Sequence, residues 1–373
     1  MLEIKVVKMI DTIRLALDVK RIPDEFKIAK SKNGVFRGVI NPTKEMKESG
    51  RYYPRVIFVK RPVRGGFSQQ FLIEFSIPKL IKGNNFSEVI DNDFDAIIKT
   101  LKEALFEMNV KWQFGAVIAN ARVVKVDYSK NIVFNDGTTI SQVLRLLNLA
   151  NIKKTMDVSS GEFRNGGQIC HLHTSGRDIA FYDKISDLKR SKISEKRSVE
   201  KDNKIQLQLL DMLAKHQNLS VLRFEIRLNG VNEIKRNLVK IGEDKNNLSF
   251  KHLFSSKISQ AILLNWWHEI FSQIPKAPLD NETVENMFLG LLKNEEAKPQ
   301  RVLATLGMKY LMQDRNFDAR FAKEVFDSRF KNGSWARSNK LLLKPEAPKN
   351  LRHLLHIEDA IKEMRPINIR EFT

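Results

Sequence analysis

Three strand-like segments carry residue types that together would cleave a phosphodiester bond. His171 and His173 flank a leucine, Tyr182 is followed two residues later by Lys184, and Glu225 stands between two arginines. Polar and apolar residues alternate in each segment, so each strand should present its polar side chains on one face of a sheet. Two imidazoles and a carboxylate can hold a divalent metal, and a tyrosine beside a metal can attack phosphate. In a strongly basic chain this combination indicates DNA strand cleavage.

Tyr182 is the candidate nucleophile, and Lys184 is its candidate partner. On the same strand face, the ammonium group would lower the cost of forming the phenolate, whose ordinary pKa is about 10. The same cation would stabilise negative charge on a pentacovalent phosphate. The alternative interpretation is a structural tyrosine, the usual role of tyrosine in a strand.

The candidate metal ligands are His171, His173, Glu225 and Asp127. The His-Leu-His pattern would place both imidazoles on one face, about 7 Å apart along the strand. Glu225 is expected to be accessible because arginines flank it, and Asp127 is the alternative or additional carboxylate. In the other interpretation the histidines line a wet groove and Glu225 forms a salt bridge with its basic neighbours. This donor set is compatible with Mg²⁺ and better suited to Mn²⁺.

The charge balance favours a polyanionic partner. The 373 residues include 64 Lys and Arg against 44 Asp and Glu, a net charge of +20. Cations that neutralise DNA phosphates gain affinity by releasing counterions, although a basic protein can also be merely soluble. We expect Arg61 and Arg64, in a basic glycine-bearing hairpin loop, to face one DNA-binding groove together with Arg223 and Arg227.

Several classes of protein are disfavoured by the sequence. The single cysteine, Cys170, excludes an intrachain disulfide or a cysteine-based zinc cluster, and we expect it to be a small buried group. The N-terminus has no signal-peptide core, and no run of about 18 apolar residues predicts a membrane span. The expectation is a cytoplasmic protein without a membrane partner.

Hydrophobic periodicity predicts an α+β protein with a largely antiparallel sheet. Alternating segments predict strands and longer spacings predict helices. The predicted strands are 11–19, 53–60, 70–77, 123–128, 168–174, 178–183 and 221–228, and the predicted helices are 94–108, one starting near 140, and one containing Leu207, Leu210 and Leu213. The order strand, helix, strand occurs twice, ending once in Lys125-Val126-Asp127 and once in Arg223-Phe224-Glu225. A structural duplication and a chance similarity are both compatible with this pattern.

The C-terminal third is predicted to be helical. We expect a catalytic domain at 1–232, a helical connecting region at 233–297, and a helical DNA-binding region at 298–373. Short basic helices at 301–312, 318–326 and 334–343 suggest a helix-turn-helix, with a bundle that only packs on the catalytic part as the alternative.

The chain resembles the gene II/X replication initiators of filamentous phages and related plasmids. The resemblance rests on Asp178–Arg190 (DIAFYDKISDLKR) and on Arg223-Phe224-Glu225 some forty residues later. The opening from Met9 and the strand containing Asp127 are also similar, so Met1–Lys8 would be an extension or an alternative start. In the wider superfamily of HUH-type nickases a His-hydrophobic-His motif binds metal, and the phage branch often lacks it.

The resemblance implies a duplicated sheet of the HUH-nickase type and a rolling-circle initiator. Tyr182 would be the nicking nucleophile, Lys184 its partner, and Asp127 and Glu225 acidic active-site groups. The enzyme would nick and rejoin origin DNA through a 5′-phosphotyrosine, in single-stranded and duplex DNA, in a bacterial cytoplasm, with the host helicase and polymerase as partners. The alternatives are a relaxase or transposase with the same chemistry, and a non-catalytic origin-binding protein or repressor.

Overall fold

The computed structural model describes most of the chain. The described residues are 7–8, 10–18, 29–30, 34–110, 115–148, 150, 156–162, 168–190, 219–274, 288, 291–292, 298–313, 328–330 and 352–367. The predicted helix containing Leu207 and the predicted helices 318–326 and 334–343 lie outside these residues. The helix-turn-helix therefore stays a prediction.

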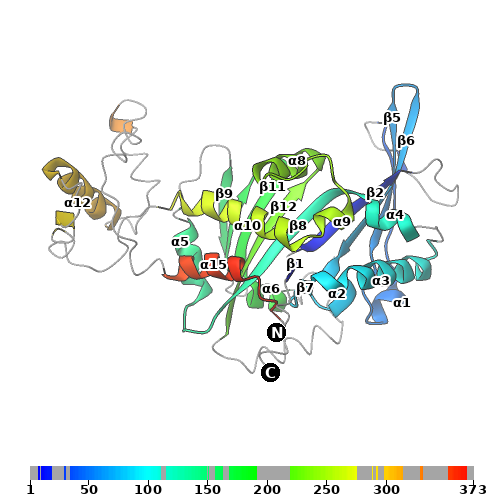
Figure 1. Ribbon diagram of the computed structural model, residues 1–373, viewed down its shortest axis with the longest axis horizontal. Helices are drawn as coiled ribbons and strands as arrows, with labels where there is room; N and C mark the ends of the chain where they lie inside the picture. The colour runs from blue at the N-terminus through cyan, green and yellow to red at the C-terminus, as the bar shows by residue number, and fades with distance from the viewer. Residues whose placement is uncertain are drawn as a thin grey trace. The chain divides into compact units, whose positions relative to one another are not determined.

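One large antiparallel sheet dominates the fold (Figure 1). Its ten described strands have the order β3-β4-β5-β6-β2-β8-β12-β11-β10-β9. In chain order they are β2 (Ile10–Asp18), β3 (Ala29–Lys30), β4 (Phe36–Ile40), β5 (Arg55–Val63), β6 (Gly66–Ser76), β8 (Arg122–Phe134), β9 (Asp157–Glu162), β10 (Gln168–His173), β11 (Arg177–Asp183) and β12 (Ser220–Asn229). A separate pair joins β1 (Val7–Lys8) to β7 (Val89–Ile90). The predicted α+β class with a largely antiparallel sheet is confirmed.

The central strands β8 and β12 alternate between an apolar and a polar face. Phe224 and Ile226 of β12 are fully buried, and Phe224 stacks on Phe181 of β11 with ring centroids 4.5 Å apart. Helices α8 (Val231–Lys240) and α9 (Phe250–Leu253) pack on this side of the sheet. The residues that alternate with Phe224 and Ile226 in β12 therefore belong to the opposite, polar face of the sheet.

The polar face is covered at one end by α6 (Lys184–Arg190). Leu188 of α6 and Phe86 pack on Val221, which shares its face with Arg223. The other described helices are α1 (Lys44–Glu48), α2 (Ile77–Lys82), the 3-10 helix η1 (Asp91–Asp93), α3 (Phe94–Glu107), α4 (Gly115–Asn120), α5 (Ile140–Asn148), α10 (Ser256–Phe271), α12 (Pro299–Gln313) and α15 (Arg352–Glu363). Cys170 is buried, as expected.

The order of the strands in the sheet bears on the predicted structural duplication. The hairpins β5–β6 and β10–β11 lie on opposite sides of the central pair β8–β12, and each precedes one strand of that pair in sequence. However, β2 is inserted between β6 and β8, whereas β12 pairs directly with β11. Because the two halves differ in this way, the repeated order of strand, helix and strand does not establish a structural duplication, and the duplication stays a prediction.

The chain forms two compact units. The first comprises Met1–Ser141, Met156–Trp266 and Ala360–Thr373, and the second comprises Gln142–Thr155 and Trp267–Asp359. The first unit continues past residue 232 because α8 and α9 pack on the sheet, and it also includes residues near the C-terminus.

Candidate functional site

Four adjacent strands bring the predicted site residues together on the polar face of the sheet. Cross-strand register aligns them in three rows, each running from β10 through β11 and β12 to β8. The rows are Ile169, Tyr182, Arg223, Asn131; then His171, Ala180, Glu225, Ser129; then His173, Asp178, Arg227, Asp127.

Tyr182 and Glu225 form the centre of this arrangement. Tyr182 is 7% exposed, and its hydroxyl donates a hydrogen bond to Glu225 Oε2 at 2.9 Å. Burial raises the pKa of Tyr182 well above its ordinary value of 10, and the charge of Glu225 raises it further. Arg223 opposes these effects only in part. In this structure the phenol is therefore protonated and held rather than activated.

Glu225 is buried between two arginines, so the expectation that it is accessible is wrong. It is 3% exposed, Arg227 Nε donates to its Oε1 at 2.9 Å, and Arg223 Nε lies 3.8 Å from its Oε2. Burial opposes ionisation, but Arg227 and Arg223 together with the hydrogen bonds outweigh it and lower the pKa of Glu225 to about 2. The carboxylate is ionised, as in the salt-bridge alternative, because its basic strand neighbours fold onto it.

Arg223 is a structural cation of the site, so the prediction that it faces a DNA groove is wrong. It is 2% exposed and donates to Asn131 Oδ1 at 3.1 Å and to Ser129 Oγ at 2.8 Å. Its Nη2 also lies 2.9 Å from Asp11 Oδ2. Arg227, whose side chain is 36% exposed, remains available at the open end of the face.

Asp127 is buried in β8 beside Lys125, whose Nζ lies 3.1 Å from Asp127 Oδ2. Burial raises the pKa of Asp127 to about 7, and the charge of Glu225 also raises it, while Lys125 lowers it in part. Two carboxyl groups on neighbouring strands thus have opposite proton affinities near neutral pH, a pattern typical of acid–base pairs.

The two histidines lie side by side on β10, with ring centroids 5.1 Å apart. Burial lowers the pKa of His171 below its ordinary 6.5, which favours the neutral form that binds metals. His171 Nε2 lies 3.6 Å from Asp178 Oδ1. Ala180 separates His171 from Glu225 in their row, so the two Cα positions are about 10 Å apart at the usual strand spacing.

Lys184 lies near Tyr182, although it does not belong to the strand. β11 ends at Asp183, and Lys184 is the first residue of α6. It is 2% exposed, and its Nζ lies 5.8 Å from the Tyr182 ring centroid and 3.4 Å from Asp187 Oδ2. Burial and, to a lesser degree, Arg223 lower the pKa of Lys184.

Arg61 and Arg64 are exposed at the end of the β5–β6 hairpin, which confirms the predicted hairpin. Four strand spacings separate β5 from β12, about 19 Å, and the hairpin end lies beyond the end of β2. The buried Arg223 cannot share a groove with Arg61 and Arg64, and a groove shared by Arg61, Arg64 and Arg227 stays a prediction.

Two carboxylates at the site were not predicted from the sequence. Asp11 reaches Arg223 from β2, and Asp178 stands between His173 and Arg227 in its row. Asp178 could have been predicted from the sequence, because the alternation in β11 places it on the same face as Tyr182. Asp11 depends on the pairing of β2 with β8, which local sequence does not reveal.

Donor groups of the types that bind divalent ions lie on the histidine side of the face. His171, His173 and Asp178 supply two imidazoles and a carboxylate close together. Glu225 and Asp127 are engaged by Arg227 and Lys125. Within the described ranges, no three His, Cys, Asp or Glu side chains are grouped so that they could hold a metal ion.

Comparisons with known proteins supply no relative. No protein-family model matches the chain, and neither the curated proteins nor the solved structures contain a match. Among the residues that the structure describes, no helix is long and apolar enough to cross a membrane.

Proposed function

We propose that this protein is a metal-dependent DNA-nicking and rejoining enzyme of the rolling-circle initiator type, with an HUH-like sheet and Tyr182 as its nucleophile. The observation that supports the proposal most is the Tyr182–Glu225 hydrogen bond, held between two arginines on a sheet face that also carries adjacent histidines. The net charge of +20 supports a DNA substrate.

In the proposed step, Tyr182 Oη attacks the phosphorus of the scissile phosphate and the bond from phosphorus to the 3′-oxygen breaks. The products are a 5′-phosphotyrosine and a free 3′-OH. Glu225 Oε2 lies where the phenol proton leaves. Asp127, with its pKa near 7, would supply the proton for the 3′-oxygen. Arg227 would stabilise negative charge on the phosphate.

A divalent cation, Mg²⁺ or Mn²⁺, would be held by His171 and His173 with the carboxylate of Asp178, and when bound it would polarise the scissile phosphate. Because the phosphotyrosine bond conserves the energy of the broken bond, the 3′-OH can attack it and rejoin the strand without ATP. A relaxase or transposase would use the same residues, and only the cognate DNA distinguishes these enzymes.

The burial of Tyr182 favours a second candidate, a non-catalytic origin-binding protein or repressor. The phenol is 7% exposed and both Glu225 oxygens already accept hydrogen bonds. In that protein the Tyr182–Glu225 pair would only stabilise the sheet. For nicking, DNA binding must expose the phenol and loosen its bond to Glu225.

Covalent attachment to DNA tests the proposal. The protein is incubated with Mn²⁺ and a pool of random single-stranded oligonucleotides labelled at the 3′ end, because a 5′-phosphotyrosine retains the 3′-terminal fragment. We expect a denaturant-resistant labelled protein from the wild type, and none from Tyr182→Phe or in excess chelator. Tyr53→Phe is the matched control, since Tyr53 also donates to a glutamate, Glu107 Oε2 at 2.7 Å, and should still form the adduct.

Two results would contradict the proposal. An adduct formed by Tyr182→Phe would place the nucleophile elsewhere. DNA binding by the wild type without any adduct would favour the origin-binding protein.

A further inference from the structure

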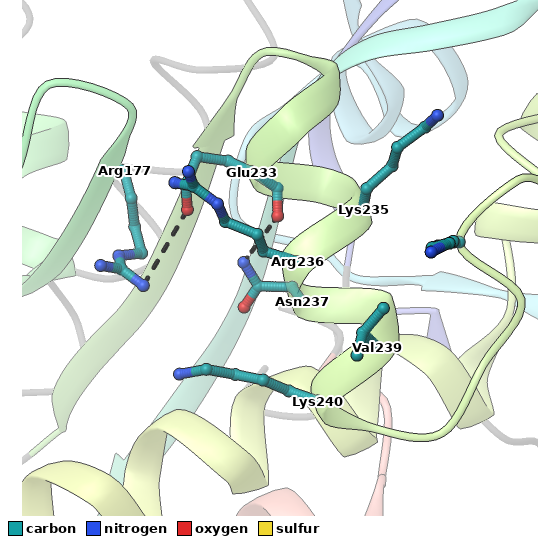
Figure 2. Close-up of a pocket in the computed structure, with 8 residues that line it drawn as sticks. Arg177, Glu233, Lys235, Arg236, Asn237, Val239 and Lys240 are labelled. Carbon is teal, nitrogen blue, oxygen red and sulfur yellow. Dashed lines mark hydrogen bonds and ion pairs between the residues drawn. The ribbon is translucent and has the colours of Figure 1, made fainter.

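A pocket lined by several basic residues lies beside α8 and the start of β11 (Figure 2). It is on the side of the sheet opposite Tyr182. Arg177 lines it, and Arg177 alternates in β11 with the residues that share the face of Tyr182. The cavity has a volume of about 410 Å³. Its lining residues come from the start of β11, from α8 and from the loop after α8: Arg177, Glu233, Lys235, Arg236, Asn237, Val239, Lys240 and Lys245.

Two of the cations are held in place by a buried indole ring. The Arg177 guanidinium lies 4.2 Å and Lys240 Nζ 4.1 Å from the ring centroid of Trp266. Trp266 is 1% exposed, and its indole N–H donates to Asn237 Oδ1 at 2.6 Å. Cation–π attraction to a fixed ring keeps two like charges near each other at the cavity.

The lining of the pocket carries more cationic than acidic side chains. Five of the lining residues are cationic and one, Glu233, is acidic; Glu233 lies 2.6 Å from Arg236 Nη1 and 3.9 Å from Arg177 Nη1. Arg177 Nε is buried and has no hydrogen-bond partner among the described residues. Lys245 is exposed. Like charges gathered in one hollow raise the local concentration of an anion.

The polar groups of the pocket suit phosphates rather than bases. Trp266 lies beneath the cations and offers no exposed ring for stacking. Asn237 is 1% exposed, its Oδ1 accepts from Trp266, and its Nδ2 donates to the Glu233 carbonyl at 2.9 Å. Ammonium and guanidinium groups contact backbone phosphates without reading sequence.

We propose that this pocket binds backbone phosphates of DNA independently of sequence, as a second contact surface on the reverse of the Tyr182 face. The choice of DNA rests on the proposed function, whereas the phosphate chemistry follows from the pocket itself. The same chemistry would also accept a nucleoside triphosphate, and the experiment separates the two ligands.

The test compares two double variants that lose the same charge. Lys235→Gln/Lys245→Gln changes the pocket, and Lys44→Gln/Lys102→Gln changes exposed lysines of α1 and α3. Affinity for a random-sequence duplex is measured from low to high KCl. For the pocket variant we expect a roughly tenfold loss of affinity at low salt and a log–log salt dependence flatter by about two units, one per lost phosphate contact. The control should retain both values.

Further measurements make every outcome decisive. Lys235→Arg/Lys245→Arg should restore affinity, and thermal unfolding should show that all variants fold. An unchanged salt dependence in the pocket variant, or an equal loss in the control, would overturn the proposal. So would a pocket variant that loses ATP binding but keeps its DNA affinity. A wild type that binds DNA without forming an adduct would contradict the proposed nicking and leave the pocket result to stand by itself.

Discussion

At the scale of single residues, the site is defined by two buried carboxyl groups in opposite environments. Glu225 lies between Arg227 and Arg223 and is ionised, because these cations outweigh the cost of burial. Asp127 forms an ion pair with Lys125, and burial outweighs the attraction of Lys125 and Arg227. Their difference in proton affinity follows from the stronger ion pairs and hydrogen bonds of Glu225, and it would supply the proposed reaction with a proton acceptor and a proton donor.

The raised pKa of Asp127 predicts a pH-dependent stability. The pKa is about 7 in the folded state against 3.8 ordinarily, so the folded protein binds more protons between these values. The stabilisation of the folded protein by protonated Asp127 is therefore complete below about pH 4 and is lost as the pH rises through 7. Asp127→Asn should raise the free energy of unfolding at pH 8 by on the order of 2 kcal/mol, with little gain at pH 4. Urea unfolding at both pH values measures this.

The control for this prediction is Asp18→Asn, which removes an exposed carboxylate of β2 that accepts a hydrogen bond from Gln70 Nε2 at 2.7 Å. It should not reproduce the gain at pH 8. If Asp127→Asn changed stability equally at pH 4 and pH 8, Asp127 would be ionised throughout and would not serve as the proton donor.

At the scale of elements, local alternation predicted the strands but not their partners. The strands around Tyr182 and Glu225 are confirmed because one polar and one apolar face leave a period of two in the sequence. Lys184 is the first residue of α6, and the alternation along a strand does not indicate where the strand ends and a helix begins. The burial of Glu225 and the position of β2 depend on pairing between strands that are far apart in the sequence, and no local pattern encodes that pairing.

A buried set of hydrogen bonds around Glu88, called the Glu88 clip below, joins β8 to the C-terminal segment. Glu88 Oε2 accepts from Lys130 Nζ at 2.6 Å and from the Ile367 amide at 3.1 Å, and Glu88 Oε1 accepts from the Asn131 amide at 2.8 Å. Lys130 also donates to the Arg365 carbonyl at 2.8 Å and is 2% exposed. The carboxylate therefore compensates a buried ammonium and holds residues 365–367 beside the sheet.

Glu88→Gln should destabilise the protein because it leaves the Lys130 charge buried without an anion. Removing one partner of a buried ion pair typically costs about 3–5 kcal/mol of unfolding free energy. The matched control is Glu48→Gln, which breaks the Lys44–Glu48 pair, whose side chains are 80% and 62% exposed, and should cost less than about 1 kcal/mol. Equal losses for the two variants in urea unfolding would contradict the role of the clip.

At the scale of the whole molecule, the two compact units interleave along the sequence. The sheet unit ends with Ala360–Thr373, so the chain returns to it after Trp267–Asp359. Ile367 packs in the same core cluster as Phe86 and Leu188, and Gln260 Nε2 donates to the Lys362 carbonyl at 2.8 Å. A truncation from residue 298 to the end would therefore damage the sheet unit as well as remove the predicted helix-turn-helix.

Internal excision separates these two effects. Replacing residues 299–350 by a flexible Gly-Ser linker removes α12 and the predicted helix-turn-helix while retaining α15 and the Glu88 clip. If the excised region contacts duplex DNA, sequence-specific affinity should be lost, and the log–log salt dependence should flatten by about one unit per lost phosphate contact. The excised protein should still form the Tyr182 adduct with short single-stranded DNA, because all residues of that face remain. Binding of duplex DNA with wild-type affinity, salt dependence and sequence preference would instead place DNA recognition on the sheet unit, and the C-terminal region would not be a DNA-binding region.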